Sequence, residues 1–144
     1  MNHQLFTNEP SWQKNGLAIL RILTGLLMCY HGWEVFNHSK MVEYAKWDVV
    51  KNLPAPLFMV YAGKGLEFIS GSLLALGLFT RPAALAMAIN MLFICFKIGN
   101  GKFYYEDQHP FIFAMMAMVF FFTGPVQWSI DQLIFKPKNS YHSY

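Results

Sequence analysis

The sequence predicts an all-α protein, an antiparallel four-helix bundle that is integral to a membrane. Hydrophobic residues make up 55% of the 144-residue chain and charged residues only 13%, whereas about a quarter of the residues in an average soluble protein are charged. Four apolar runs are each close to the ~20 residues with which an α-helix crosses a hydrocarbon core. They span about residues 16–36, 56–79, 82–99 and 110–128. A chain of this length is expected to form a single domain, residues 1–144.

The first run is interpreted as a retained helix, because it follows a mostly polar segment and lacks the short basic leader of a signal peptide. Between the first two runs, apolar and charged residues alternate at helical spacing. They are Met41, Val42, Ala45 and Val49 on one side and Glu43, Lys46 and Asp48 on the other. This pattern predicts a short interfacial helix, ended by Pro54 and Pro56.

Only Thr80-Arg81-Pro82 separates the second and third runs, so these helices are expected to be antiparallel neighbours, the third beginning at Pro82. The Gly99-Asn100-Gly101 turn and the aromatic cluster Phe103-Tyr104-Tyr105 then lead into the fourth run, and such aromatics are typical of a membrane interface. A stripe of small residues on the fourth run suits close helix packing, within the bundle or between copies. It consists of Ala114, Ala117, Phe121 and Gly124.

Ionisable residues lie inside the apolar runs, where a charged side chain costs about 2.5–3.5 kcal/mol near the bilayer centre. They are Arg21, His31 and Glu34 in the first run, Lys64 and Glu67 in the second, and Lys97 in the third. If the first two helices are antiparallel, His31 and Lys64 lie at the same depth, about fifteen residues from the terminal side, with Glu67 about one turn away. We therefore predict one polar pocket lined by His31, Glu34, Lys64 and Glu67, with Asn90 on the facing third helix.

A pocket of this kind suits a lipid-soluble redox substrate such as a quinone, whose ring needs an apolar slot and whose oxygens need one or two donors. We assign hydrogen bonding of the substrate oxygen to His31 and Lys64 and proton exchange to Glu67, which makes His31 and Glu67 the catalytic candidates. The substrate-binding candidates are Arg21, His31, Glu34, Lys64, Glu67 and Asn90. A structural interpretation stays open, in which the same charges form ion pairs that hold the helices in register.

Other kinds of site have less support. No metal site is predicted, because the paired Glu-x-x-His motifs of carboxylate-bundle metal proteins are missing, and the cofactor is unspecified beyond a candidate quinone. The other histidines, which are expected at interfaces or in tails, are His3, His38, His109 and His142. Cys29 and Cys95 are expected to pack as apolar residues, although their similar depth leaves a disulfide or a shared ligand open. The mild net charge of +3 gives no sign of nucleic-acid binding.

Three segments, in order along the chain, resemble the DoxX family. The first, Arg21-Ile-Leu-Thr-Gly-Leu-Leu-Met-Cys-Tyr-His31-Gly32-Trp, is similar to the family's first helix, in which an Arg precedes a small-residue turn and a His-Gly pair. The second, Glu67-Phe-Ile-Ser-Gly71-Ser-Leu-Leu-Ala-Leu-Gly77-Leu-Phe-Thr80-Arg81, resembles its second helix and tight turn. The third, Thr123-Gly124-Pro125-Val-Gln-Trp-Ser129-Ile-Asp131, is similar to its closing Ser-x-Asp segment. Many relatives carry a Lys near the position of Glu34, so this chain differs there.

The resemblance covers roughly residues 16–135 and implies a four-helix protein of the bacterial inner membrane, in contact with the lipid bilayer and with both termini cytoplasmic. Some DoxX-like proteins are described as subunits of quinone-linked sulfur oxidoreductases, and others accompany oxidative-stress enzymes or assist the assembly of other proteins. We therefore expect a redox-associated subunit with a redox-enzyme partner, and whether the chain is itself an enzyme stays open. The alternative is a non-enzymatic scaffold or assembly factor that uses its outer loops and the small-residue stripe. A transporter is a third reading, and a homo-oligomer is also open.

Overall fold

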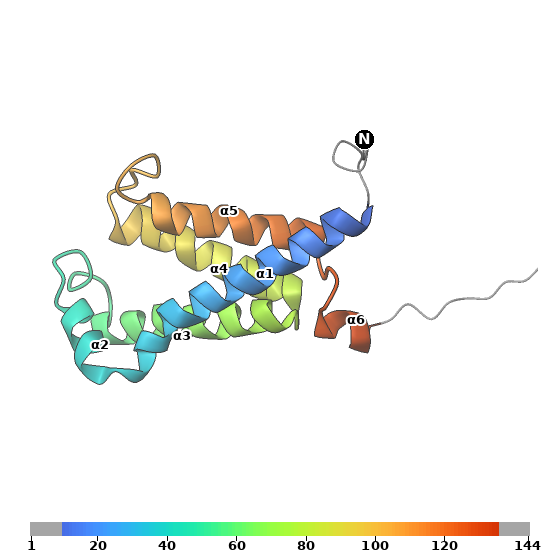
Figure 1. The fold of residues 1–144 in the computed structure, drawn as a ribbon. Coiled ribbons are helices and arrows are strands. Elements are labelled where there is room, and N and C mark those ends of the chain that lie inside the picture. Colours follow the sequence, from blue (N-terminus) through green and yellow to red (C-terminus); the bar gives the residue numbers. More distant parts are fainter. Residues whose placement is uncertain (1–9, 136–144) are drawn as a thin grey trace, which may run out of the picture.

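The computed structural model describes residues 10–135, and every regular element in this range is a helix (Figure 1). The four long helices are α1 (Pro10–Gly32), α3 (Pro56–Leu76), α4 (Thr80–Phe93) and α5 (Gln108–Thr123). The short elements are the 3-10 helix η2 (Trp33–Phe36), α2 (His38–Ala45), the π-helical turn η3 (Ile94–Ile98) and α6 (Ile130–Ile134). Helices α1 and α4 run toward the end of the molecule that holds α2, whereas α3 and α5 run away from it (Figure 1).

Three helical stretches are long and apolar enough to cross a membrane, which confirms the all-helical, membrane-spanning class. They are Trp12–Phe36, Pro56–Leu76 and Thr80–Ile98. The fourth apolar helix, α5, is shorter than predicted and ends at Thr123 instead of near residue 128. The chain leaves the helix at Gly124, whose φ of 70° lies in the left-handed region that favours glycine.

Glycines bring α1 and α3 into backbone contact. A Cβ on Gly25 would lie 2.4 Å from the backbone nitrogen of Ala75, and a Cβ on Gly32 would lie 2.2 Å from that of Phe68. Gly71 on α3 faces α1 in the same way, with 2.5 Å to the nearest backbone nitrogen. Small residues allow this close approach in membranes, where packing rather than water exclusion drives helix association.

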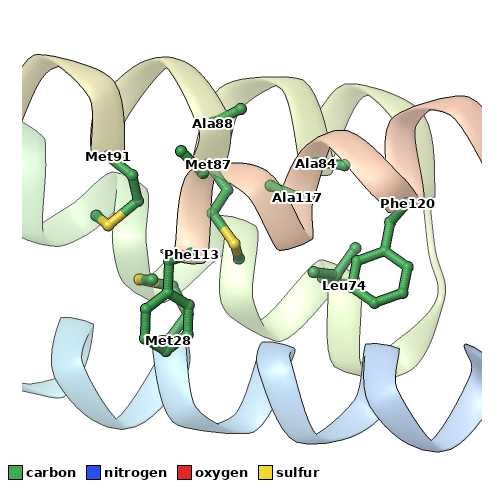
Figure 2. Packing of buried hydrophobic residues seen from close by; sticks show 10 residues of the cluster. Met28, Leu74, Ala84, Met87, Ala88, Met91, Phe113, Ala117 and Phe120 are labelled. Atoms are coloured by element: carbon green, nitrogen blue, oxygen red, sulfur yellow. The ribbon is translucent and has the colours of Figure 1, made fainter. Parts of the chain in front are cut away.

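The apolar core lies between α4 and α5 and is closed by residues of α1 and α3 (Figure 2). Its largest members are Met28, Leu74, Met87, Met91, Phe113 and Phe120. Ala114 and Ala117 of α5 are fully buried opposite Ala84 and Ala88 of α4. The alanines of the predicted small-residue stripe therefore pack inside the bundle, and Phe121 of the same stripe is partly buried against the core.

A distant carboxylate determines where α4 begins. Gly77, with a φ of 65°, ends α3, and α4 starts at Thr80, two residues before the predicted start at Pro82. Asp131 accepts hydrogen bonds from the backbone N–H groups of Phe79 (2.7 Å) and Thr80 (2.8 Å) and from the Thr80 hydroxyl (2.7 Å). These bonds satisfy N–H groups that the first turn of a helix leaves free, so the C-terminal segment caps α4.

The short helix predicted between the first two spans is present as α2, and the side chain of Asn37 caps it by accepting a hydrogen bond from the backbone N–H of Lys40 (3.2 Å). Met41 is its buried residue. The helix ends at Ala45, well before the predicted end at Pro54, because residues 46–55 fold into turns.

Candidate functional site

A cavity of about 490 Å³ lies at the α2 end of the molecule, and its wall includes residues of α1, α3, α4, η3, α5 and the segment around α2. Most of the wall is apolar. The polar and ionisable residues that line it are His31, Tyr44, Lys64, Glu67, Asn90 and His109. A volume of this size lies within the range of small-molecule sites, which combine an apolar wall with a few placed polar groups.

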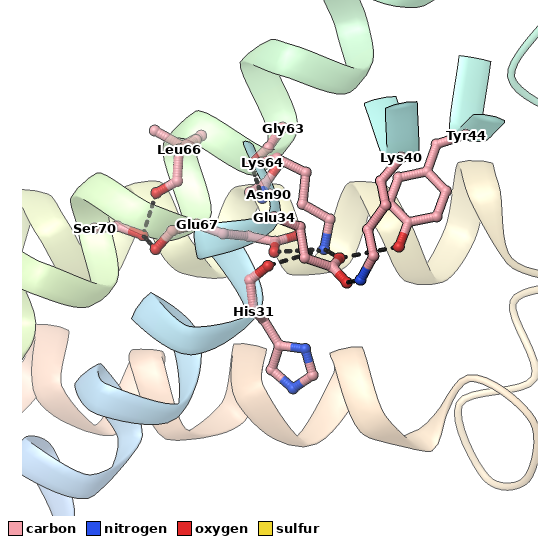
Figure 3. A network of polar contacts seen from close by, with 10 residues as sticks. All are labelled: His31, Glu34, Lys40, Tyr44, Gly63, Lys64, Leu66, Glu67, Ser70 and Asn90. Carbon is pink, nitrogen blue, oxygen red and sulfur yellow. Dashed lines mark hydrogen bonds and ion pairs between the residues drawn. The ribbon is translucent and has the colours of Figure 1, made fainter. Parts of the chain in front are cut away.

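An ion-pair network lies beside this cavity (Figure 3), and its members Lys64 and Glu67 line the cavity wall. The ammonium nitrogen of Lys64 lies 2.9 Å from Glu67 Oε2, 3.3 Å from Glu34 Oε2 and 3.4 Å from the backbone oxygen of His31. These three acceptors match the three N–H donors of the lysine. The Glu67 side chain is only 4% exposed, against 20% for Lys64. In this network all three N–H donors of Lys64 have an acceptor, and one buried carboxylate, that of Glu67, lies beside the cavity.

Glu34 extends the network to α2. Its Oε1 accepts a hydrogen bond from Lys40 (2.7 Å) and its Oε2 accepts one from the Tyr44 hydroxyl (3.0 Å). The hydrogen bond to Glu34 raises the pKa of Lys40 above its ordinary value, while burial, followed by the hydrogen bond to Glu34, raises the pKa of Tyr44. The charged groups thus form a continuous series from half-exposed Lys40 to buried Glu67.

Local folding explains why these side chains meet. Lys64 and Glu67 are three residues apart on α3, so they lie on one face of that helix. Gly32 ends α1 in backbone contact with α3, and the tight turn η2 that follows brings Glu34 to Lys64. Asn90 comes from α4, where its side-chain amide donates a hydrogen bond to the backbone oxygen of Gly63 (3.2 Å).

The imidazole of His31 points away from the ion pairs toward α5 (Figure 3). Its ring centroid lies 5.0 Å from that of His109 and 6.2 Å from that of Phe113. Within residues 10–135 neither histidine ring makes a hydrogen bond to the protein, and Glu67 Oε1 and the Asn90 side-chain oxygen accept none. These groups therefore remain available to a ligand in the cavity.

The structure brings together five of the six predicted substrate-binding residues, His31, Glu34, Lys64, Glu67 and Asn90. Of these five, only Glu34 does not line the cavity wall itself. Sequence reasoning missed Lys40, Tyr44 and His109. Lys40 and Tyr44 belong to α2, and His109 lies at the start of α5, at the edge of its apolar run.

Arg21 lies elsewhere. Its fully buried guanidinium donates to the backbone oxygens of Val126 (3.4 Å), Gln127 (3.3 Å) and Trp128 (2.8 Å), beside the turn at Gly77. It precedes His31 by ten residues on α1, or ~15 Å. Arg21 therefore anchors the segment after α5 and does not line the cavity.

Lys97 is exposed and also lies outside the cavity wall. Both cysteines are free: Cys29 Sγ lies 3.3 Å from the hydroxyl of Ser72, and Cys95 contacts the backbone oxygen of Asp107. No group of three or more potential metal ligands (His, Cys, Asp or Glu) occurs in the described residues. His3 and His142 lie outside the described residues.

These features define an all-helical membrane protein with ionisable residues beside an internal cavity. The DoxX family model matches residues 16–100, and the chain belongs to the DoxX family. It is similar to an uncharacterized protein of Haemophilus influenzae, with 25% identity over 90% of this chain and 98% of that protein. It also resembles the Bacillus subtilis protein named "Putative oxidoreductase CatD", with 25% identity over 87% of this chain and 91% of that protein. An uncharacterized membrane protein of Mycobacterium tuberculosis is 24% identical over 88% of this chain and 90% of that protein. No solved structure matches the chain.

Proposed function

We propose that this DoxX-family protein is a redox-associated subunit of the bacterial inner membrane that binds a quinone or a similar lipophilic molecule in the cavity. The observation that carries the proposal is an apolar cavity of about 490 Å³ whose wall includes a few hydrogen-bonding groups. Such a space accepts an apolar ring and still offers partners to its oxygens. The relative named as an oxidoreductase supports the redox class.

Residue roles follow from which groups are free. In this proposal His31 hydrogen-bonds a ligand oxygen, because its ring faces the cavity without a hydrogen bond to the described residues. Glu67 exchanges the proton through its unbonded oxygen. Lys64 is a positioning residue, since its three donors are already directed at Glu67, Glu34 and the backbone of His31.

The chemistry needs a partner. Conversion of a quinone to a quinol takes up two electrons and two protons. We assign the electrons to a redox-enzyme subunit, and the protons to Glu67 and the charged series that joins it to Lys40 at the surface. A group within hydrogen-bond reach of the proton it transfers satisfies the geometric requirement for acid–base catalysis.

The proposed membrane arrangement has four antiparallel spans. Helix α5 carries no ionised residue from Phe111 to Thr123 and packs along α4, which together with η3 is long enough to span. With α5 as a fourth span, both ends of the chain lie on one face, which we place in the cytoplasm.

The test is the quinone content of protein purified in a mild detergent, measured by extraction and mass spectrometry. His31→Ala and Glu67→Gln should each lower bound quinone about tenfold, the equivalent of one hydrogen bond of about 1.4 kcal/mol. Lys97→Gln is the matched control, because Lys97 lies outside the cavity wall. Unchanged quinone content in both cavity variants would rule out the assignment.

A scaffold or assembly factor is the second candidate. Asp107 fastens the loop after η3, because its carboxylate accepts hydrogen bonds from the backbone N–H groups of Asn100 (2.8 Å) and Lys102 (3.0 Å). The loop presents Tyr104 and Tyr105 at more than 70% exposure, as a protein-binding surface would. A partner that copurifies with the His31→Ala variant but is lost on changing both tyrosines to serine would favour this function.

A further inference from the structure

The cavity has a side opening between α3 and α4. Ile89 of α4 lines the cavity and is 59% exposed, and Ala62 of α3 also lines it and is exposed. A residue that both lines a cavity and faces outward lies at its rim. Because α3, and α4 together with η3, are long and apolar enough to cross a membrane, this rim faces the hydrocarbon of the bilayer.

Gly63 lies at the base of this opening. A Cβ added to Gly63 would meet only the side-chain oxygen of Asn90, at an ordinary contact distance of 3.7 Å. The space above Gly63 is therefore open, in contrast to Gly25 and Gly71, where backbone atoms of the neighbouring helix fill it. Helix packing therefore does not require a glycine at position 63. Because glycine has no side chain, the path from the cavity to the rim over Gly63 is open.

The chemistry of the wall changes along this path. The polar residues Glu67 and Asn90 are buried, while the apolar residues Leu66 and Phe93 are partly exposed and Ile89 is exposed. A ligand that matches this gradient has a polar head and an apolar tail. A cavity of about 490 Å³ suits a drug-sized ring system, so a long tail must continue outside it.

We propose that the ligand is a long-tailed prenyl or alkyl lipid such as a prenylquinone, whose head lies at His31 and Glu67 and whose tail leaves between α3 and α4 over Gly63. This inference rests on the proposed function and adds to it the class of ligand, its direction of binding and Gly63 as a specificity-determining residue. A molecule of this kind enters from the bilayer and never has to expose its tail to water.

The experiment compares two probes with one head group, a ubiquinone with a single isoprene unit and a ubiquinone with a decyl tail. Their dissociation constants are measured with the full chain in lipid nanodiscs by quenching of tryptophan fluorescence, with Trp47 in the cavity wall as the reporter. The variant is Gly63→Leu, which places a side chain across the opening. The matched control is Gly65→Leu on the same helix, where an added Cβ meets nothing within 4 Å and the residue does not line the cavity.

Gly63→Leu should weaken binding of the decyl probe about tenfold relative to the one-isoprene probe, and Gly65→Leu should leave the ratio of the two dissociation constants unchanged. Equal losses for both probes, or no loss for either, would overturn the tail exit while leaving quinone binding in place. Failure of both probes to bind the unaltered protein would overturn the proposed function as well. Far-UV circular dichroism of Gly63→Leu establishes that the variant is folded.

Discussion

The ammonium of Lys64 lies 2.9 Å from the carboxylate of Glu67, one helical turn along α3, and Glu67 is only 4% exposed. A second carboxylate, that of Glu34, lies 3.3 Å from the same ammonium. The pair is therefore a buried unit, in which loss of the cation leaves a charge without its main partner. Breaking such a pair on one side costs more than replacing both partners together.

This relationship predicts a non-additive double-mutant cycle. Lys64→Met should lower the free energy of unfolding by about 3 kcal/mol, whereas the double variant Lys64→Met/Glu67→Gln should recover much of that loss. Reversible unfolding in mixed micelles, followed by circular dichroism, measures both values. The comparison variant is Lys51→Met, which breaks an exposed pair with Asp48 and should cost less than about 1 kcal/mol. Additive losses would mean that the buried ion pair does not form.

The contact of α1 with α3 predicts a strong position dependence among glycines of one helix. Gly71→Leu forces the two backbones apart and should cost about 3 kcal/mol of unfolding free energy or prevent folding. Gly65→Leu should be tolerated, since its added side chain meets open space. Thermal unfolding of the two variants side by side measures the difference, and equal melting temperatures would contradict the backbone contact.

The hydrophobic pattern was sufficient to predict the helices, because the residues of each long apolar run must be buried or face lipid along the whole run. Depth along the helices likewise predicted that His31, Lys64 and Glu67 line one cavity, since a rise of ~1.5 Å per residue determines the height of each side chain in a bundle. Boundaries were less accessible: α4 begins at Thr80 because Asp131, some fifty residues later, caps it.

Arg21 illustrates what the pattern could not reveal. From the sequence it was a substrate-binding candidate, but its partners are three backbone oxygens of residues 126–128. Backbone acceptors leave no mark in the sequence. Tyr44 and His109 were missed for a related reason, because each reaches the cavity from a segment outside the apolar runs or at the edge of one.

The α2 contacts to Glu34 predict a loss of stability at alkaline pH. Lys40 and Tyr44 both have pKa values raised by the fold, so folding favours their protonated forms. Their contributions are complete below the unfolded-state pKa values of about 10 and are lost as the pH rises through the raised folded-state values. Tyrosine ionisation is followed by absorbance at 295 nm while the pH is raised, in the unaltered protein and in Tyr44→Phe. The difference between the two titration curves is the ionisation of Tyr44, which should occur above the ordinary tyrosine range. Ionisation at or below that range would show that the hydrogen bond to Glu34 is absent.

The cap on α4 predicts that Asp131 stabilises the protein from outside the apolar runs. Asp131→Ala removes the acceptor of three hydrogen bonds and leaves the buried N–H of Thr80 without a partner, so the free energy of unfolding should fall by about 3 kcal/mol. The stability of Asp131→Asn should lie between that of Asp131→Ala and that of the unaltered protein. The asparagine amide keeps one oxygen as an acceptor but turns an NH₂ group toward the remaining donors. Asp48→Ala is the control, since the Asp48 side chain is 91% exposed. Thermal unfolding ranks the stabilities of the three variants. Limited proteolysis of the segment after α5 should also become faster in Asp131→Ala, because the loss of these hydrogen bonds releases α6 from the turn between α3 and α4. A melting temperature of Asp131→Ala equal to that of Asp48→Ala would show that α4 is capped by other groups.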